Sequence, residues 1–281
     1  MRIGIIGAGR AGTSLGKYFG EKGNVPVGFY DKDSVAAKEA AEFVQTAVFQ
    51  TLSQLVRESD ILFITTPDAW ILPVWEELKT MSLENQIICH CSGALSSDSF
   101  SGREHMNVSC CSVHPMLPFS NRFSSYEQLN HAFFTVEGQP HAVAVLTKLL
   151  TSFGNEVCRI DAEKKPKYHA AASILSNQVI AVLDLGYSLL EECGFSRSDA
   201  IRATEALVKR NVENVIKEGC AGALTGPIER GDVQTVKKHL DCLSDADQAL
   251  YQMLGERLLS IAKKKHPKAD YAELEAFFAQ D

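Results

Sequence analysis

A glycine-rich turn near the start of the chain constrains the fold more than any other feature. The turn follows an apolar run, Ile3–Ile6, that has the pattern of a strand, and it opens a helical pattern. In such a turn the first glycine makes the tight bend, the second lets the backbone approach a diphosphate, and the third lets the helix pack closely. The free N–H groups at the start of the helix then face the diphosphate. The pattern predicts a dinucleotide site formed by Gly7, Ala8, Gly9, Arg10, Ala11 and Gly12.

An acidic residue lies at the distance that this kind of site requires. Asp31 ends the next predicted strand, Val25–Tyr30, and stands 19 residues beyond Gly12. A carboxylate there accepts hydrogen bonds from a ribose diol and favours NAD, whereas Lys32 and Ser34 beside it could hold the 2′-phosphate of NADP. We therefore expect NAD(P) as cofactor and leave the choice between NAD and NADP open. The alternative is a Rossmann fold that has lost its cofactor.

Alternating strand and helix patterns fill the chain as far as Ile160. Such alternation is typical of an α/β fold with a doubly wound, mostly parallel sheet that helices cover on both faces. The predicted strands are Ile3–Ile6, Val25–Tyr30, Ile61–Thr65, Ile87–Cys91, Val108–Val113, Phe133–Val136 and Glu156–Ile160, and the predicted helices are Ala11–Glu21, Val35–Phe43, Leu52–Glu58, Trp70–Lys79 and Ala142–Phe153. Only helical patterns follow, which predicts a Rossmann domain over residues 1–162 and an all-α substrate and dimerisation domain over residues 163–281.

The first helix of the second predicted domain is unusually apolar. It is predicted to begin at Lys167, with Pro166 in its first turn, and apolar residues surround much of its girth. A helix with this pattern is buried, either in the core of its own domain or against a second subunit. Together with the size of the helical domain, the pattern favours a homodimer in which the second domains pack together.

Charge and composition argue against several classes of partner. The formal net charge is −7 and no basic stripe is present, so we do not expect binding to nucleic acid. Charged residues interrupt the apolar stretches, so we expect no membrane span. The strand pattern directly after Met1 leaves no room for a signal peptide. These features predict a soluble, cytoplasmic protein.

The eight cysteines are scattered along the chain, which is typical of free thiols in a reducing compartment. Two close pairs, Cys89 with Cys91 and Cys110 with Cys111, could suggest a zinc site. Strand alternation sends Cys110 and Cys111 to opposite faces of a sheet, so four ligands do not converge. We expect neither disulfides nor a metal site.

Three polar turns follow predicted strands and, if these strands are parallel, share one edge of the sheet with the glycine-rich turn. We expect Thr66 and Pro67 to line the cofactor, and Ser92 and His114 to flank the nicotinamide. His114 could bind a substrate carboxylate or donate a proton; alternatively, it is a turn histidine that bonds to the backbone. Asp68 is interpreted as the N-cap of the next helix.

A polar stripe is predicted on the apolar helix after residue 162. His169, Ser173 and Asn177 are spaced four apart and share one helix face. Reduction of a carbonyl needs a proton donor, which suits His169, and groups that stabilise the developing negative charge, which suit Ser173 and Asn177. His169 could instead be a structural histidine bonded to a carbonyl group. Asn177 is costly to bury among apolar residues without a ligand or a partner.

One arginine in the second predicted domain is a candidate substrate ligand. Arg230 lies in a loop between helices and could bind a substrate carboxylate through two hydrogen bonds. The alternative is an ion pair with Asp232 or Glu229 that orders the loop.

The order of the motifs resembles a known family. The motifs are GAGRAG (7–12), TTPD (65–68), CSGA (91–94), SVHPM (112–116), KYHAAASILSN (167–177) and LTGPIERGD (224–232). Nearly the whole chain resembles a family of oxidoreductases that couples a Rossmann-like domain to a C-terminal domain of unknown function. Its layout is similar to the 6-phosphogluconate dehydrogenase-like superfamily, which includes 3-hydroxyacid dehydrogenases, ketopantoate reductases and pyrroline-5-carboxylate reductases. The hydroxyacid dehydrogenases usually carry a lysine four residues before an asparagine, and this chain has Ser173 there.

The resemblance implies an NAD(P)-dependent oxidoreductase. Hydride would pass between the cofactor and a small C=O or C=N substrate bound between the domains, with His114, His169, Ser173 and Asn177 around the reacting atoms. A 2-oxo acid such as ketopantoate and a cyclic imine of the pyrroline-5-carboxylate type are both candidate substrates. Two alternatives stay open: a non-catalytic dinucleotide-binding sensor or assembly protein, and an oxidoreductase that passes hydride to a second cofactor such as a deazaflavin.

Overall fold

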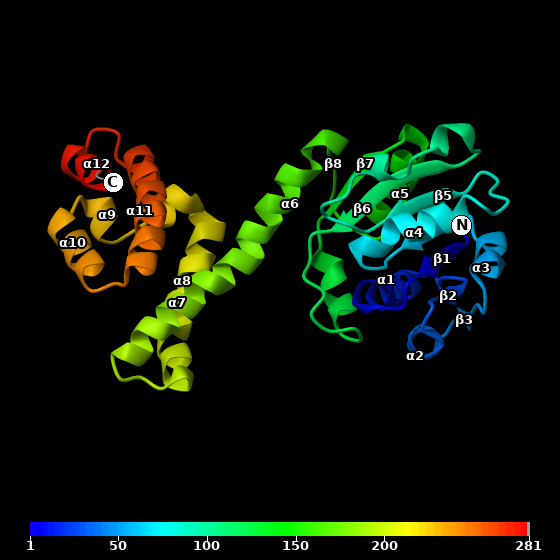
Figure 1. Ribbon diagram of the computed structural model, residues 1–281, viewed down its shortest axis with the longest axis horizontal. Helices are drawn as coiled ribbons and strands as arrows, with labels where there is room; N and C mark the ends of the chain where they lie inside the picture. The colour runs from blue at the N-terminus through cyan, green and yellow to red at the C-terminus, as the bar shows by residue number, and fades with distance from the viewer. Residues whose placement is uncertain (280–281) are drawn as a thin grey trace. The chain divides into compact units, whose positions relative to one another are not determined.

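The protein is described by a computed structural model that covers residues 1–279. The chain divides into two compact units, Met1–Gln178 and a second unit that begins at Val179 (Figure 1). We describe each unit by itself.

The first unit is built around a mostly parallel sheet. Within the described residues its strands follow the order β3-β2-β1-β4-β5-β6-β7-β8, and every neighbouring pair is parallel except β6 and β7. The strands are β1 Ile3–Ile6, β2 Gly28–Tyr30, β3 Ala47–Val48, β4 Ile61–Ile64, β5 Ile87–His90, β6 Ser109–Pro115, β7 Phe134–Gly138 and β8 Val157–Arg159. The predicted fold class is confirmed. Strand β3 was not predicted, because two residues are too few to show a periodic pattern.

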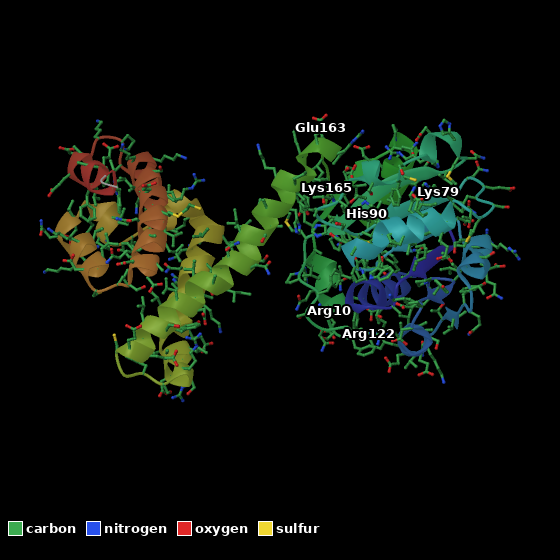
Figure 2. All side chains as sticks on the ribbon, viewed as in Figure 1. Arg10, Lys79, His90, Arg122, Glu163 and Lys165 are labelled. Atoms are coloured by element: carbon green, nitrogen blue, oxygen red, sulfur yellow. The ribbon has the colours of Figure 1, made fainter. Side chains whose placement is uncertain are left out.

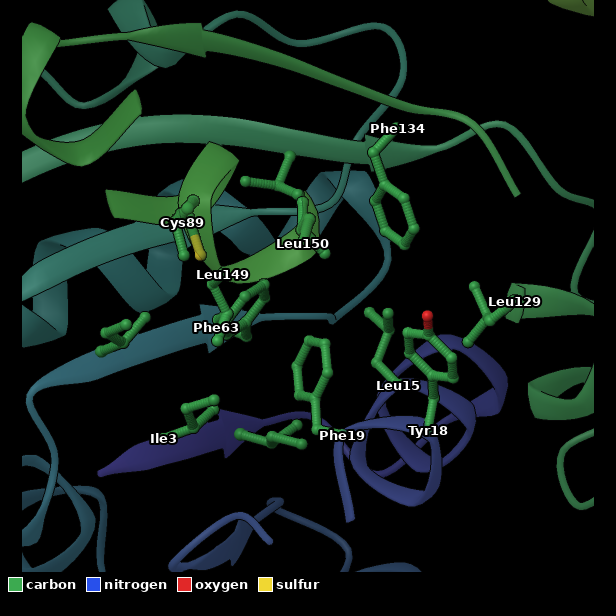
Figure 3. Packing of buried hydrophobic residues seen from close by; sticks show 14 of the residues in the cluster. Ile3, Leu15, Tyr18, Phe19, Phe63, Cys89, Leu129, Phe134, Leu149 and Leu150 are labelled. Carbon is green, nitrogen blue, oxygen red and sulfur yellow. The ribbon is translucent and has the colours of Figure 1, made fainter. Parts of the chain in front are cut away.

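Strand alternation builds one apolar layer on each face of the sheet. One layer joins Phe63 and Cys111 to helices α1, α2 and α5; the other joins Leu62 and Cys110 to helices α3 and α4. The helices are α1 Arg10–Glu21, α2 Ser34–Val44, α3 Leu52–Glu58, α4 Asp68–Leu78 and α5 Pro140–Ser152. Figure 3 shows Phe19 of α1 beside Phe63 in the first layer. The two adjacent cysteines therefore face opposite layers, as strand alternation requires.

The second unit is helical throughout its described residues. It contains α7 Val179–Glu192, α8 Arg197–Ala223, α9 Pro227–Arg230, α10 Val233–Asp241, α11 Asp245–Lys265 and α12 Ala272–Phe278. Its core is small and joins Ile228, Val236, Leu240, Leu259 and Leu274. Gly219 interrupts α8 with a φ of 73°, a left-handed conformation that glycine adopts readily.

The compact units separate later in the chain than the predicted boundary at residue 162. That boundary was placed where the strand patterns end, but the segment that follows packs on the first unit. Helix α6, Lys165–Ser173, and the π-helical segment Ile174–Gln178 belong to it. Lys165 is fully buried there, and Tyr168 bonds to His114 of β6.

The expectation that no stretch could span a membrane needs correction. The helical stretch Ala162–Glu192 contains an 18-residue window with a mean hydropathy of 1.3, long and apolar enough to cross a membrane by length and composition. The sequence argument assumed that charged residues interrupt every apolar stretch, but residues 168–183 carry no charged side chain. None of that window is buried, so the chain's own core does not cover this helix. The same length and composition also suit a helix that packs on another protein.

The two tryptophans of α4 allow a matched test of the core. Trp75 is fully buried and donates its indole N–H to the Ser101 carbonyl oxygen at 2.9 Å, whereas Trp70 is 48% exposed. We expect Trp75→Ala to lower the free energy of unfolding of the first unit by about 3–5 kcal/mol, since it opens a large cavity. Trp70→Ala should change it by less than about 1 kcal/mol. Urea unfolding followed by far-UV circular dichroism measures both, and equal losses would contradict this packing.

Candidate functional site

The glycine-rich turn between β1 and α1 is tight at one glycine and open at another. Gly7 adopts a φ of 102°, which favours glycine. A Cβ on Gly12 would clash with the Gly7 carbonyl oxygen and with Thr65 Oγ1. Gly9 is the N-cap of α1, and a Cβ there would meet none of the described atoms within 4 Å. The turn therefore leaves free space in front of the helix N-terminus, where an anion is favoured.

A cavity of about 260 Å³ lies beside this turn. Its walls come from the ends of β1, β2 and β4 and from α4, and they include the predicted cofactor residues Gly7, Gly9, Asp31, Lys32, Thr66 and Pro67. Ala8 and Gly12 are buried behind the turn and Arg10 is exposed, and these three, with Ala11 and Ser34, do not line the cavity. Sequence reasoning missed Tyr30, Trp70 and Glu77, which line it as well.

Asp31 and Lys32 are both engaged by protein groups. The Asp31 carboxylate accepts the backbone N–H of Ala8 at 2.6 Å and that of Asp33 at 2.9 Å. Asp31 thus ties the end of β2 to the glycine-rich turn. The Lys32 ammonium lies 3.7 Å from the centre of the Trp70 ring, in a cation–π contact. A carboxylate and an ammonium group therefore stand side by side at the end of this cavity.

Thr66 lines the same cavity and has an unsatisfied polar atom. Its Oγ1 is buried and has no hydrogen-bond partner among residues 1–279. Buried hydroxyl groups are nearly always paired, so an orphan in a cavity wall indicates a ligand that would satisfy it.

A second cavity of the first unit, about 340 Å³, brings the predicted catalytic residues together. Its lining residues are His114, Met116, Leu117, Pro118, His169, Ala172, Ser173, Leu175, Ser176 and Asn177. His114 comes from β6, and the other polar groups come from α6 and the π-helical segment. Sequence reasoning predicted a regular helix here; the segment Ile174–Gln178 instead has the wider π geometry, which is rare and frequent at functional sites.

Both histidines of this cavity converge on Gly93, in the turn after β5. A Cβ on Gly93 would lie 2.7 Å from His169 Nδ1 and 2.9 Å from His114 Nε2. The other ring nitrogen of His114, Nδ1, lies 2.7 Å from the hydroxyl of Tyr168. Burial, and then the positive charge of Lys165, lower the pKa of His114 to about 4. The His114 imidazole is therefore neutral at physiological pH and donates or accepts hydrogen bonds without carrying charge.

Lys165, at the start of α6, was not predicted as a site residue (Figure 2). It is fully buried, and its ammonium donates to the Ser92 carbonyl oxygen at 2.7 Å and to Ser112 Oγ at 2.8 Å. Burial lowers its pKa to about 8. Three lysines stand within four residues here, and nothing in the sequence separates Lys165 from Lys164 or Lys167. Lys167, which the sequence analysis placed at the helix start, is exposed.

Ser92 and Asp68 support each other rather than face a cavity. The Ser92 hydroxyl donates to the Asp68 carboxylate at 2.7 Å and accepts the backbone N–H groups of Ala94 and Leu95. Ser92 is buried and lines neither cavity. The interpretation of Asp68 as an N-cap is wrong: Pro67 holds that position, and Asp68 is the first helical residue of α4.

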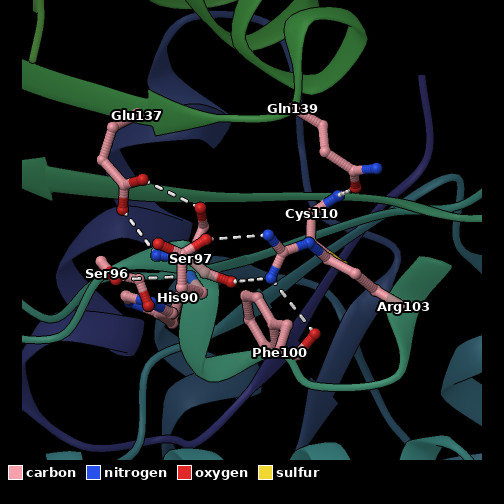
Figure 4. Close-up of polar contacts among 9 residues, drawn as sticks. His90, Ser96, Ser97, Phe100, Arg103, Cys110, Glu137 and Gln139 are labelled. Carbon is pink, nitrogen blue, oxygen red and sulfur yellow. Dashed lines mark hydrogen bonds and ion pairs between the residues drawn. The ribbon is translucent and has the colours of Figure 1, made fainter. Parts of the chain in front are cut away.

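A buried polar network braces the turn after β5 (Figure 4). The Glu137 carboxylate of β7 accepts the backbone N–H of Ser97 at 2.7 Å and its hydroxyl at 2.8 Å. Arg103 donates to the Ser97 and Phe100 carbonyl oxygens. Burial lowers the pKa of His90 to about 4, so its ring is neutral beside the Ser96 carbonyl oxygen at 3.2 Å. The network holds the segment from which Gly93 faces the two histidines.

Two residues of the predicted polar stripe are more open than the sequence suggested. His169 and Asn177 are exposed and Ser173 is half-buried. The argument that Asn177 would be costly to bury therefore does not apply to this chain, because the apolar side chains around it are exposed too: Ile174 is 59% exposed and Leu175 is 76% exposed.

Arg230 ends α9 in the second unit and is exposed. Neither alternative ion-pair partner is bonded to it among the described residues. Glu229 pairs with Lys265 and His266, and Asp232 caps α10 by accepting the backbone N–H of Thr235. A role in binding a substrate carboxylate stays a prediction.

The cysteines and histidines do not form a metal centre in the part of the chain that the structure describes. Residues 1–279 hold no group of three or more histidine, cysteine, aspartate or glutamate side chains placed to bind a metal ion. The eight cysteines are free thiols.

Two family models match the chain. Residues 1–115 match a Rossmann-like domain, and residues 132–258 match a domain of unknown function, DUF2520. A comparison with functionally curated proteins gives no significant match.

Several solved structures share the fold over nearly their whole length. Protein TM1727 from Thermotoga maritima is 25% identical, with a TM-score of 0.75 and coverage of 94% of this chain and 99% of that one. BF3122 from Bacteroides fragilis, to which an NADP oxidoreductase activity is attributed, is 23% identical, with a TM-score of 0.73 and coverage of 92% and 98%. A pyrroline-5-carboxylate reductase from Coxiella burnetii is 14% identical, with a TM-score of 0.63 and coverage of 94% and 98%.

The family models agree with the resemblance that the motif order indicated. The glycine-rich turn lies inside the first matched region, and the residues from Ala132 to Leu258, which include Tyr168 and His169, lie inside the second. The chain therefore carries a match to a Rossmann-like domain followed by a match to a DUF2520 domain, in the order that the resemblance implies.

Proposed function

We propose that this protein is an NAD(P)-dependent oxidoreductase that transfers hydride to or from a small C=O or C=N substrate. One observation carries the proposal: a glycine-rich turn with an open helix N-terminus stands beside a cavity lined by Thr66, whose buried hydroxyl is unpaired among the described residues. The second cavity, lined by two imidazoles, lies at the carboxyl end of β6. Because β1, β4, β5 and β6 are parallel, the glycine-rich turn and His114 share one edge of the sheet, where open α/β sheets bind ligands.

The residues of the first cavity fit a dinucleotide. Gly7 and Gly9 leave room for the diphosphate at the N-terminus of α1, and Thr66 supplies a free hydroxyl group. Asp31 suits the ribose diol of NAD, whereas Lys32 suits the 2′-phosphate of NADP. The bound nicotinamide supplies the hydride or accepts it.

The second cavity has the groups that carbonyl or imine reduction requires. His114 offers a neutral imidazole, and Ser173 and Asn177 add hydroxyl and amide donors that suit developing negative charge. His169 is exposed and lines the same cavity, and an imidazole in this position suits a proton donor. Arg230 is proposed as a substrate ligand, and Ser92 acts through the turn that it caps. Several proteins of this fold are named as C=N reductases, among them an imine reductase from Myxococcus stipitatus at 18% identity and a TM-score of 0.61.

We further propose a cytoplasmic homodimer in which a second copy covers the exposed apolar helices. Ile180 of α7 is 66% exposed and Ile216 of α8 is 80% exposed. Large apolar residues at this exposure on neighbouring helices are typical of an interface between subunits.

The cofactor site is tested by two alanine variants of the same region. Gly9→Ala adds a methyl group that meets no described atom but points into the space assigned to the diphosphate. We expect unchanged thermal stability and NADH or NADPH binding weakened by about tenfold or more, since a blocked diphosphate contact costs at least ~1.4 kcal/mol. Gly20→Ala, whose Cβ would lie 3.9 Å from Val25, is the matched control on α1. Calorimetric titration measures both affinities. Equal affinities of the two variants would show that the dinucleotide does not bind at this turn.

The reaction is tested by following NADH or NADPH absorbance with a panel of 2-oxo acids and cyclic imines. We expect one class to be reduced, and His169→Asn to lower kcat by about 10² to 10⁴ while cofactor affinity stays the same, as for loss of a general acid. Full turnover by the variant would remove His169 from the chemistry. Cofactor binding without turnover of any substrate would favour the non-catalytic sensor.

The assembly is tested by light scattering after size exclusion at micromolar concentration. We expect a mass near twice 30.8 kDa for the native chain and near 30.8 kDa for the double variant Ile180→Asp, Ile216→Asp. The control is Val35→Asp, on α2 of the first unit, where a residue that is 64% exposed changes in the same way. A monomeric native protein would contradict the proposed dimer. A native protein that stays in solution only with detergent would also contradict it, and would favour a helix that binds a membrane.

A further inference from the structure

Tyr168 has two hydrogen-bond partners among the described side chains, Thr135 and the His114 ring. Its hydroxyl lies 2.7 Å from Nδ1, with the two rings nearly perpendicular at 85°. Burial raises the pKa of Tyr168, so the phenol keeps its proton. The hydrogen bond with Thr135 lowers the pKa of Tyr168, as a bond donated to the phenol oxygen does, so Nδ1 of His114 is left to accept the phenol proton.

This bond determines which nitrogen of His114 carries the hydrogen. When the phenol donates to Nδ1, the proton of the neutral ring stands on Nε2. Nε2 is the nitrogen that faces Gly93, and His114 lines the second cavity. The opposite tautomer would leave the phenol without its acceptor and would turn the lone pair of Nε2 toward Gly93. Tyr168 thus makes His114 a hydrogen-bond donor at the site.

The charges around His114 act in the same direction. Among the charged groups, Lys165 lowers the pKa of His114 most, and His169 and His90 lower it further, whereas Asp68 raises it. The Asp68 carboxylate is occupied by the Ser92 hydroxyl and lies outside the cavity wall. The wall itself contains no aspartate or glutamate within the described residues. The wall therefore offers no carboxylate to pair with a cation, and its described residues include no lysine or arginine either.

We propose that Tyr168 is a positioning residue that holds His114 as an Nε2–H donor, and that the cavity takes an oxygen acceptor, the carbonyl of a 2-oxo acid, rather than a cationic iminium. The inference rests on the proposed function and narrows its substrate class. An iminium nitrogen carries a proton and has no lone pair, so it cannot accept from Nε2–H, whereas a ketone oxygen and a carboxylate both can.

The tautomer is read directly from the full-length native protein labelled with ¹⁵N-histidine. Two-bond ¹H–¹⁵N spectra, with His114→Gln for assignment, should show a protonated Nε2 and a bare Nδ1 from pH 8 down to about pH 5, because the pKa of His114 is about 4. Tyr168→Phe should mix the two tautomers, whereas Tyr187→Phe, on α7, should leave them unchanged. A proton on Nδ1, or an imidazolium at pH 7, would overturn the proposal without any variant.

The substrate class is tested with two small probes, oxamate for a 2-oxo acid and pyrrolidinium for an iminium. Oxamate should shift the His114 signals and bind roughly tenfold more weakly to Tyr168→Phe, as expected when one directed hydrogen bond is lost. Pyrrolidinium should not shift them. The reverse preference would overturn this inference and leave the cofactor site intact. Failure of NADH and NADPH to bind in calorimetry would instead overturn the proposed function, and the tautomer would still be read from the spectra.

Discussion

A buried ammonium group connects the parts of the site in the first unit. Lys165 joins the first turn of α6 to the Ser92 carbonyl oxygen after β5 and to the Ser112 hydroxyl of β6. Burying a cation costs several kcal/mol. The two hydrogen bonds, and the negative charges of Glu137 and Asp68, offset only part of this cost. The remaining cost is visible in its lowered pKa of about 8. Together with burial, which has the larger effect, this charge lowers the pKa of His114 and keeps its ring neutral.

The sheet makes this arrangement rigid. Strand β6 extends to Pro115 because it pairs with the antiparallel β7, so His114 lies inside a hydrogen-bonded ladder opposite Thr135. The sequence predicted the strand to end at Val113 and placed His114 in a turn. A side chain on a strand is held more precisely than one on a loop. In the same ladder Glu137 of β7 lies opposite Ser112 and bonds to Ser97, which fixes the segment that contains Gly93.

Much of the fold, and a smaller part of the site, could be predicted from the sequence. Local patterns were sufficient for the glycine-rich turn, for α3, whose bounds match, and for the alternation that separates Cys110 from Cys111. Lys165 could not be found, because its burial depends on where α6 meets the sheet and its neighbours in sequence are similar lysines. The exposure of Asn177 was missed because apolar neighbours suggested burial, whereas the chain alone leaves the apolar face of that helix uncovered.

The π-helical segment depends on the anchors that precede it. A π turn is a poor hydrogen-bonding geometry that persists only where surrounding contacts hold it. Here Lys165 and Tyr168 fix the start of the helix on the first unit, and the irregular turn follows from Ile174. In a regular α-helix, a spacing of four would place Asn177 on the same face as Ser173. The wider π turn shifts Asn177 from that position, but both residues still line the cavity. The irregular turn thus places the polar Ser176 and Asn177 in the cavity wall beside Leu175, an apolar side chain that is 76% exposed.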